Sequence, residues 1–124
     1  MTSWIDTVKG ITDGDRRRDY GHPMTNFLRI CIYWSEFLGT PVSPRQFVHM
    51  MTLMKVARDQ HSFKVDNHID IMGYEVGLGL VLERMQDLGY GFEEFEGKFA
   101  VHNMLEAYRA SIALDADEDK EPDG

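Results

Sequence analysis

The sequence predicts an all-α protein, an antiparallel bundle of four to five helices, and three observations lead to this fold class. Apolar residues recur in five segments at the three- and four-residue spacing of amphipathic helices. No segment alternates apolar and polar residues as a half-buried strand does. The connections between segments are short, which favours antiparallel packing of successive helices. With 124 residues and 43% apolar content, the chain suits a single domain with its own core.

The first two expected helices have clear boundary signals. Residues 3–14, "SWIDTVKGITDG", offer Ser3 as an N-cap and stop at the final Asp-Gly pair. The second helix begins after "YGHP", because Pro23 suits a first helical turn, and ends at Gly39. Its expected apolar stripe consists of Phe27, Ile30, Cys31, Trp34, Phe37 and Leu38.

Three further helices follow. The third takes Ser43 as N-cap and Pro44 at its first position, and it extends to about Gln60. Its apolar residues are Phe47, Met50, Met51, Leu53, Met54 and Ala57. The fourth covers about residues 66–88, after which "LGYGFEEFEGK" interrupts the pattern, and the fifth covers about residues 99–114.

Charge divides the chain into a helical domain, residues 1–114, and an acidic tail, residues 115–124. The tail, "DADEDKEPDG", holds six acidic residues and one lysine, so it carries −5 of the formal net charge of −8. A segment with so few apolar residues buries too little surface to offset the entropy of ordering. We therefore expect residues 115–124 to be disordered and to solvate the protein.

Composition also restricts function and location. No apolar run reaches the length of about 18 residues that a membrane span needs, and the amino terminus does not resemble a signal peptide, so we expect a cytoplasmic protein. DNA binding through "RRR", residues 16–18, and the third helix is a third and weaker alternative, because the overall acidic charge argues against nucleic-acid binding. Cys31 has no second cysteine to pair with and lies in an apolar run, which favours a small core residue over a reactive thiol.

The stretch "KVDNHIDIMGY", residues 64–74, carries the main candidate site. Asp66 and Asp70 lie four residues apart, on one face of the fourth helix. Lys55 and Arg58 share a face of the third helix, and the short connection "HSFKV" brings the end of that helix close to the start of the next. The four charged side chains are therefore expected to meet.

Two interpretations of this cluster remain open. The four residues can form an ion-pair network that only fixes how the helices pack. Alternatively, the two aspartates hold Mg²⁺, with Glu36 as a further ligand, while Lys55 and Arg58 bind phosphate oxygens. The glycines of the fourth helix, Gly73, Gly77 and Gly79, favour close packing of a neighbouring helix, or close approach of a ligand.

The segment "RRRDYGHPMTN", residues 16–26, is a second candidate. Tyr20 offers a ring and a hydroxyl, and Asn26 lies in the first turn of a helix, where free backbone N–H groups attract anions. The simpler interpretation is a loop that closes one end of the bundle. The histidines and Cys31 lack the spacing of a zinc site, and no phosphate-binding glycine loop or serine-hydrolase signature is present.

Three linked motifs resemble those of a family of small phage and prophage proteins with no established activity. They are R-x-x-x-Y-G-x-P-x-x-N-F from Arg16, M-x-x-x-K-x-A-R from Met51, and D-x-x-x-D-x-x-G-Y from Asp66 to Tyr74. The resemblance covers about residues 14–80. It implies a phage-encoded protein that acts in the host cytoplasm.

More distantly, the helical arrangement and the paired acids are similar to the all-α, MazG-like nucleoside triphosphate pyrophosphatases. This resemblance implies that Asp66 and Asp70 are catalytic metal ligands for Mg²⁺, and that Lys55 and Arg58 neutralise a triphosphate. The family's glutamate cluster on the earlier helix is reduced here to Glu36.

The sequence therefore leads to two functional hypotheses. The first is a phage protein that binds a nucleotide or a nucleotide-like phosphate compound and hydrolyses it with Mg²⁺. The expected substrate-binding residues are Lys55, Arg58, Tyr20, Asn26, Arg16 and Tyr74. The second is a non-catalytic protein that binds a host protein, in which the charged cluster is structural. Under either hypothesis, the many aromatic residues and methionines favour a homo-oligomer.

Overall fold

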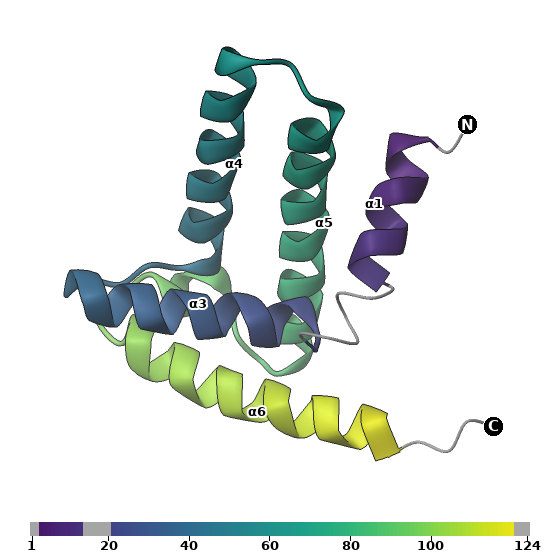
Figure 1. The fold of residues 1–124 in the computed structure, drawn as a ribbon. Helices are drawn as coiled ribbons and strands as arrows, with labels where there is room; N and C mark the ends of the chain where they lie inside the picture. The colour runs from purple at the N-terminus through teal and green to yellow at the C-terminus, as the bar shows by residue number, and fades with distance from the viewer. Residues whose placement is uncertain (1–2, 14–20, 121–124) are drawn as a thin grey trace.

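The computed structural model describes residues 3–13 and 21–120, and within these ranges it is helical, without a strand (Figure 1). The elements are α1 (Trp4–Asp13), α3 (Pro23–Leu38), α4 (Pro44–His61), α5 (Val65–Asp87), the short 3-10 helix η1 (Phe92–Phe95) and α6 (Ala100–Lys120). The predicted all-α helical bundle is confirmed. In the part of the chain that is described, no helix is both long and apolar enough to span a membrane.

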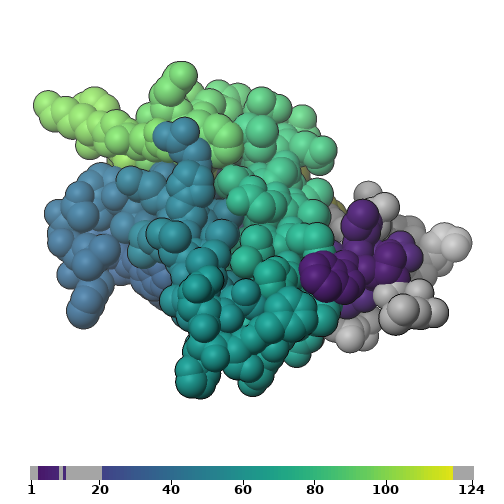
Figure 2. Space-filling model, turned by 90° about the horizontal axis from the view of Figure 1, so that it is seen from above, coloured from purple at the N-terminus to yellow at the C-terminus, as the bar shows by residue number. Residues whose placement is uncertain are grey.

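The helices form two layers. In Figure 1, α4 and α5 stand side by side as an antiparallel hairpin, and α3 and α6 cross beneath them. From above, α1 occupies one side of the molecule, next to α5 (Figure 2). Val8 of α1 is buried, and the Trp4 ring stacks on His68 of α5 with the ring centroids 5.7 Å apart. His68 Nε2 in turn lies 2.9 Å from Asp59 Oδ1 of α4.

The helix boundaries follow local signals. Ser3 Oγ accepts a hydrogen bond from the Asp6 N–H at the start of α1. Ser43 caps α4 in a reciprocal arrangement, because its hydroxyl accepts from the Gln46 N–H while Gln46 Oε1 accepts from the Ser43 N–H. Gly39 ends α3 with a positive φ of 70°, a conformation that glycine adopts without steric cost. These boundaries agree with those predicted.

The Phe47 ring of α4 lies among three other aromatic rings in the core. Its centroid lies 4.9 Å from that of Phe27, 5.4 Å from Trp34 and 6.2 Å from Tyr74, each in an edge-on arrangement. Phe27 and Trp34 belong to α3, and Tyr74 belongs to α5. One aromatic side chain therefore joins the crossing layer to the hairpin.

The predicted apolar stripes are wrong at several positions. Phe37 and Leu38, in the last turn of α3, are 90% and 55% exposed. Because α3 crosses the hairpin and does not run alongside it, its last turn extends past α4 (Figure 1). On α4, the predicted stripe residues Met50, Leu53 and Ala57 are also exposed.

The last helix is longer than expected. It begins at Ala100, close to the expected Phe99, but it continues through the expected end at Leu114 to Lys120. Residues 115–120, which we expected to be part of a disordered tail, are therefore helical, and residues 121–124 lie outside the described part. Asp115 and Glu118 both contact Arg84 of α5, and these contacts anchor the acidic turns.

Candidate functional site

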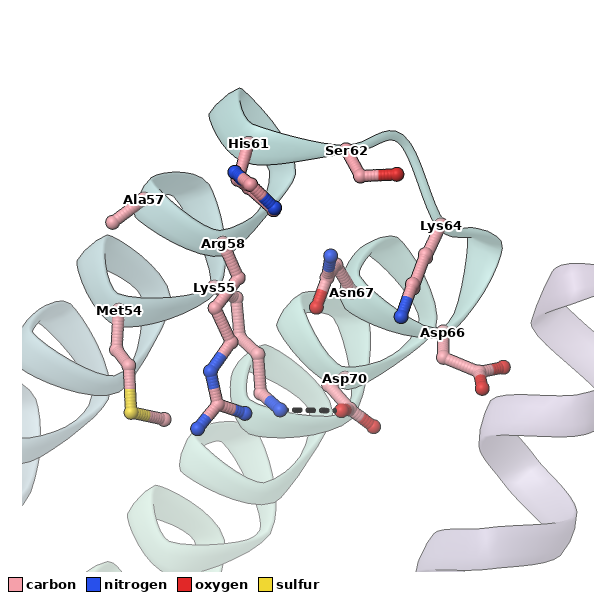
Figure 3. A pocket seen from close by; sticks show the side chains of 10 residues that line it. All are labelled: Met54, Lys55, Ala57, Arg58, His61, Ser62, Lys64, Asp66, Asn67 and Asp70. Carbon is pink, nitrogen blue, oxygen red and sulfur yellow. Dashed lines mark ion pairs between the residues drawn. The ribbon is translucent and has the colours of Figure 1, made fainter.

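An open cavity of about 760 Å³ lies where α4 ends and α5 begins (Figure 3). The lining residues are Met54, Lys55, Ala57, Arg58, His61, Ser62, Lys64, Asp66, Asn67 and Asp70. The four charged residues predicted to meet are all among them. The antiparallel hairpin explains this arrangement, since it brings the last turns of α4 against the first turns of α5.

Two of the four charged residues form an ion pair. Lys55 Nζ lies 2.8 Å from Asp70 Oδ2, drawn as the dashed line in Figure 3. The Lys55 side chain is only 11% exposed, so its ammonium group is held between the helices and partly shielded from water. This pair fits the structural interpretation of the cluster.

Arg58 behaves differently. It is exposed on the wall of the cavity, and its guanidinium group lies beside the Lys55 side chain (Figure 3). Among the described residues, no carboxylate forms an ion pair with it. Lys64 lines the cavity from the start of α5 and is exposed as well. The cavity therefore has two exposed cations in addition to the paired Lys55.

The predicted metal ligands do not converge. Asp66 is exposed, and its carboxylate points away from Lys55 and Arg58 (Figure 3). Glu36 is an exposed residue of α3 that does not line the cavity. Within residues 3–13 and 21–120, no group of three or more histidine, cysteine or acidic side chains is arranged to hold a metal ion. The donor set at the cavity thus fits Mg²⁺ poorly, because one oxygen of Asp70 already contacts an ammonium group.

The other candidate residues that the structure describes lie elsewhere. Tyr74 is part of the aromatic core beside Phe47 and does not line the cavity. Asn26 is half-buried in the first turn of α3, also away from the cavity. Arg16 and Tyr20 fall outside the described residues. Therefore no described residue of the second candidate segment, residues 16–26, lines the cavity.

The turn before α3 contacts the C-terminal helix. His22 caps α3, because its Nδ1 accepts a hydrogen bond at 3.0 Å from the Met24 N–H. Gly21 has a φ of 78°, and a Cβ atom there would lie 2.7 Å from Asp115 Oδ2. These contacts of Gly21 and His22 agree with the simpler interpretation, a loop that closes one end of the bundle.

Sequence reasoning missed a buried polar network at that end. Arg84 is 7% exposed and donates hydrogen bonds to Asp115 Oδ1 at 2.7 Å, Glu118 Oε1 at 2.7 Å and Ser111 Oγ at 3.0 Å. Thr25 Oγ1 donates to Asp115 Oδ2 at 2.7 Å. A signal was present in the sequence, since a single arginine lies in the apolar run "GLVLERMQ" and its acidic partners lie in the segment taken as a tail.

The network changes the acidity of Asp115. Burial by itself raises the pKa of this carboxyl group. Hydrogen bonds from Arg84 and Thr25, the positive charge of Arg84 and the backbone N–H of His22 favour the ionised form and outweigh burial. The pKa of Asp115 therefore lies below its ordinary value.

Cys31 is a core residue, as predicted. It is fully buried, and burial raises the pKa of its thiol to about 12. A thiol that stays protonated at neutral pH is a poor nucleophile. Cys31 therefore contributes to packing and offers no reactive thiolate.

Comparison with known proteins supports the predicted phage relationship. The chain is 35% identical over 86 residues to the Gene 55 protein of Mycobacterium phage L5, an alignment that covers 68% of this chain and 53% of that protein. It is 32% identical over 73 residues to the Gene 55 protein of Mycobacterium phage D29, which covers 58% of this chain and 48% of that protein. The chain thus spans about half the length of these relatives.

No solved structure matches the chain. The model of one protein family matches residues 3–82, which include every residue that lines the cavity. This match begins before α1 and ends within α5, so it leaves out Arg84 and α6. Because the match spans well over half of the sequence, the chain belongs to the family described as "Domain of unknown function (DUF6378)".

Proposed function

We propose that this protein binds a small phosphate-bearing molecule of the nucleotide class in the cavity between α4 and α5. The observation that carries the proposal is Arg58, an exposed guanidinium group in the cavity that forms no ion pair with any described carboxylate. Arginine in such a position presents a planar set of donors that matches two phosphate oxygens. Lys64 adds a second exposed cation to the same cavity.

The remaining lining supports a ligand with an apolar portion. Met54 and Ala57 lie on α4 next to the cations, and they offer apolar surface on which a flat ring can rest. Asn67, which is buried, supplies an amide with both a donor and an acceptor. A phosphate group flanked by a ring is the arrangement that a nucleotide provides.

A thermal-shift screen tests the binding. Nucleoside mono-, di- and triphosphates and inorganic phosphate are added to the full chain, and the unfolding temperature is measured. A ligand at about 100 times its dissociation constant stabilises the protein by about 2.7 kcal/mol. Arg58→Ala is expected to abolish the shift. Arg109→Ala, which removes an exposed arginine on α6, is the matched control and is expected to leave the shift unchanged.

Two outcomes would contradict the proposal. One is that no phosphate compound stabilises the wild type. The other is a shift of equal size in wild type and Arg58→Ala, which would place the ligand elsewhere. If Arg58 were instead a structural residue, its replacement would lower the unfolding temperature without ligand, whereas we expect little change because the side chain is exposed.

Hydrolysis is a more specific form of this function, and the MazG-like resemblance is what implies it. It would require Mg²⁺ at Asp66 and Asp70 and a water molecule directed at a nucleotide phosphate, and the donor set at the cavity fits this requirement poorly. Release of pyrophosphate from nucleoside triphosphates in the presence of Mg²⁺ is the assay. Turnover by the wild type that is lost in Asp70→Asn would support it, and its absence would leave a binding protein without this activity.

A second candidate function is supported by exposed aromatic residues on α3. Tyr33 and Phe37 lie one turn apart and are 68% and 90% exposed. Exposed apolar residues grouped in this way are typical of protein contacts. We propose them as a surface for a host protein or for a second copy of this chain. Light scattering tests self-association, and Phe37→Ser is expected to shift an oligomer toward the monomer.

A further inference from the structure

The ion pair between Lys55 and Asp70 leads to a further inference, which rests on the proposed phosphate site. We infer that the ligand binds without Mg²⁺, and that the Lys55 ammonium group acts as the resident cation of the cavity. The MazG-like resemblance implies a metal ion among the carboxylates. The residues present favour an ammonium group in that place.

The first step concerns Asp70. Its Oδ2 atom lies 2.8 Å from Lys55 Nζ, and the side chains of Lys55 and Asp70 are 11% and 29% exposed. Mg²⁺ would have to displace this ammonium group in order to use that oxygen. The displaced lysine would lose its only described carboxylate partner while remaining in a poorly hydrated position, which is unfavourable. The existing pair therefore competes with a metal ion.

The second step concerns the other acids. Mg²⁺ is usually held by one or two carboxylates together with ligand phosphates. Asp66 points away from Lys55 and Arg58 (Figure 3), and Glu36 does not line the cavity. Asp70, already paired, is thus the carboxylate that remains near the cations. To bind Asp70, a metal ion would have to displace Lys55 and give up part of its own hydration shell.

The third step concerns the charge that a ligand meets. An ammonium group has three donors, and the contact with Asp70 uses one of them. Lys55, Arg58 and Lys64 carry three positive charges in the lining, and Asp66 and Asp70 offset two, which leaves one net positive charge. A free phosphate ester therefore meets an excess of positive charge. Binding of Mg²⁺ to the ligand would neutralise part of its negative charge and weaken this attraction.

Calorimetric titration of ATP into the full chain, in EDTA and in excess Mg²⁺, tests the inference. We expect the dissociation constant in EDTA to be equal to that in Mg²⁺ or lower. A dissociation constant that falls by about tenfold or more when Mg²⁺ is added would overturn the inference and leave the phosphate site intact. If ATP, AMP and inorganic phosphate fail to bind in both buffers, the proposed function itself is overturned.

Two variants sharpen the test. Lys55→Met removes the ammonium group and releases Asp70, so we expect weaker binding in EDTA and a new dependence on Mg²⁺. Lys64→Met is the matched control, expected to weaken binding without creating that dependence. Circular dichroism and thermal unfolding establish that each variant is folded.

Asp70→Asn provides a separate measurement if Lys55→Met does not fold. It keeps Lys55 and removes the negative charge that holds it, so we expect ATP to bind in EDTA at least as tightly as to the wild type. A site built around a metal ion would instead lose affinity in this variant. Loss of binding in Asp70→Asn, with the fold retained, would therefore contradict the inference.

Discussion

At the scale of single residues, Arg84 and Asp115 determine how the end of α6 is held. The two side chains meet at 2.7 Å in a site where Arg84 is almost entirely buried. A buried arginine without carboxylate partners would be strongly unfavourable. The acidic residues of α6 therefore stabilise α5, which carries Arg84, as well as α6 itself. Acidic residues that suggested a solvated tail thus complete the core at one end.

The pH dependence of stability follows from Asp115. Its pKa is lower in the folded protein than its ordinary value of 3.8, so its ionised form stabilises the fold above that pH, and the contribution is lost as pH falls through the folded pKa. We expect Asp115→Asn to be less stable than wild type at neutral pH, and the difference to shrink as pH falls below 3.8. Urea unfolding at a series of pH values measures it.

The control for this prediction is Asp117→Asn, which removes an exposed acid from the same helix. It should change the free energy of unfolding little at any of these pH values. If the free energies of unfolding of Asp115→Asn and wild type differ by the same amount throughout the acid range, ionisation of Asp115 does not stabilise the fold.

At the scale of helices, α5 shows how glycines of one helix serve different purposes. Gly77 allows the Phe27 ring of α3 to approach the α5 backbone, since a Cβ atom there would lie 2.7 Å from Phe27 Cζ. Gly73, one turn earlier, has no atom within 4 Å of its equivalent position. Close packing, the first of the two interpretations of these glycines, therefore applies to Gly77.

Alanine substitutions should separate the two glycines. Gly77→Ala is expected to destabilise the protein by about 1–3 kcal/mol, because the added methyl group displaces a ring that is packed in the core. Gly73→Ala is the matched control and should stabilise α5 by about 0.5–1 kcal/mol through helix propensity. The midpoints of urea unfolding provide the comparison. Equal effects of the two substitutions would refute the packing explanation.

At the scale of the whole molecule, stability depends on the packing of α3 and α6 against the hairpin of α4 and α5. Phe47 contacts rings from α3 and α5 at once, so it links three of the helices. The cavity depends on this packing only indirectly, since it lies at the far end of the hairpin (Figure 1, Figure 3). The proposed site lies away from the core, so it should tolerate substitutions that the core does not.

Substitutions of two phenylalanines compare the core with the exposed end of α3. Phe47→Ala should cost about 3–5 kcal/mol, since it leaves a void among three rings. Phe37→Ala should change stability by less than about 0.5 kcal/mol, because the side chain is 90% exposed. Thermal unfolding distinguishes them. A large loss of stability in Phe37→Ala would mean that a second copy of the chain covers it in solution.

The sequence alone determined the features that depend on near neighbours. The caps at Ser3 and Ser43 and the stop at Gly39 were predictable because their hydrogen bonds and backbone angles involve residues a few positions away. The meeting of Lys55 and Arg58 with Asp66 and Asp70 in one lining was predictable for a similar reason, since a short connection restricts how two helices can lie.

Only the tertiary structure decided which side chains face each other across long separations. Asp70 pairs with Lys55 and not with Arg58, and Asp66 points away from both cations. These two features depend on how the two helices are rotated about their axes. The partnership of Arg84 with Asp115, and the exposure of Phe37, depend on how α3 and α6 cross the hairpin. Helical periodicity specifies which residues share a face, but packing against other helices determines what that face meets.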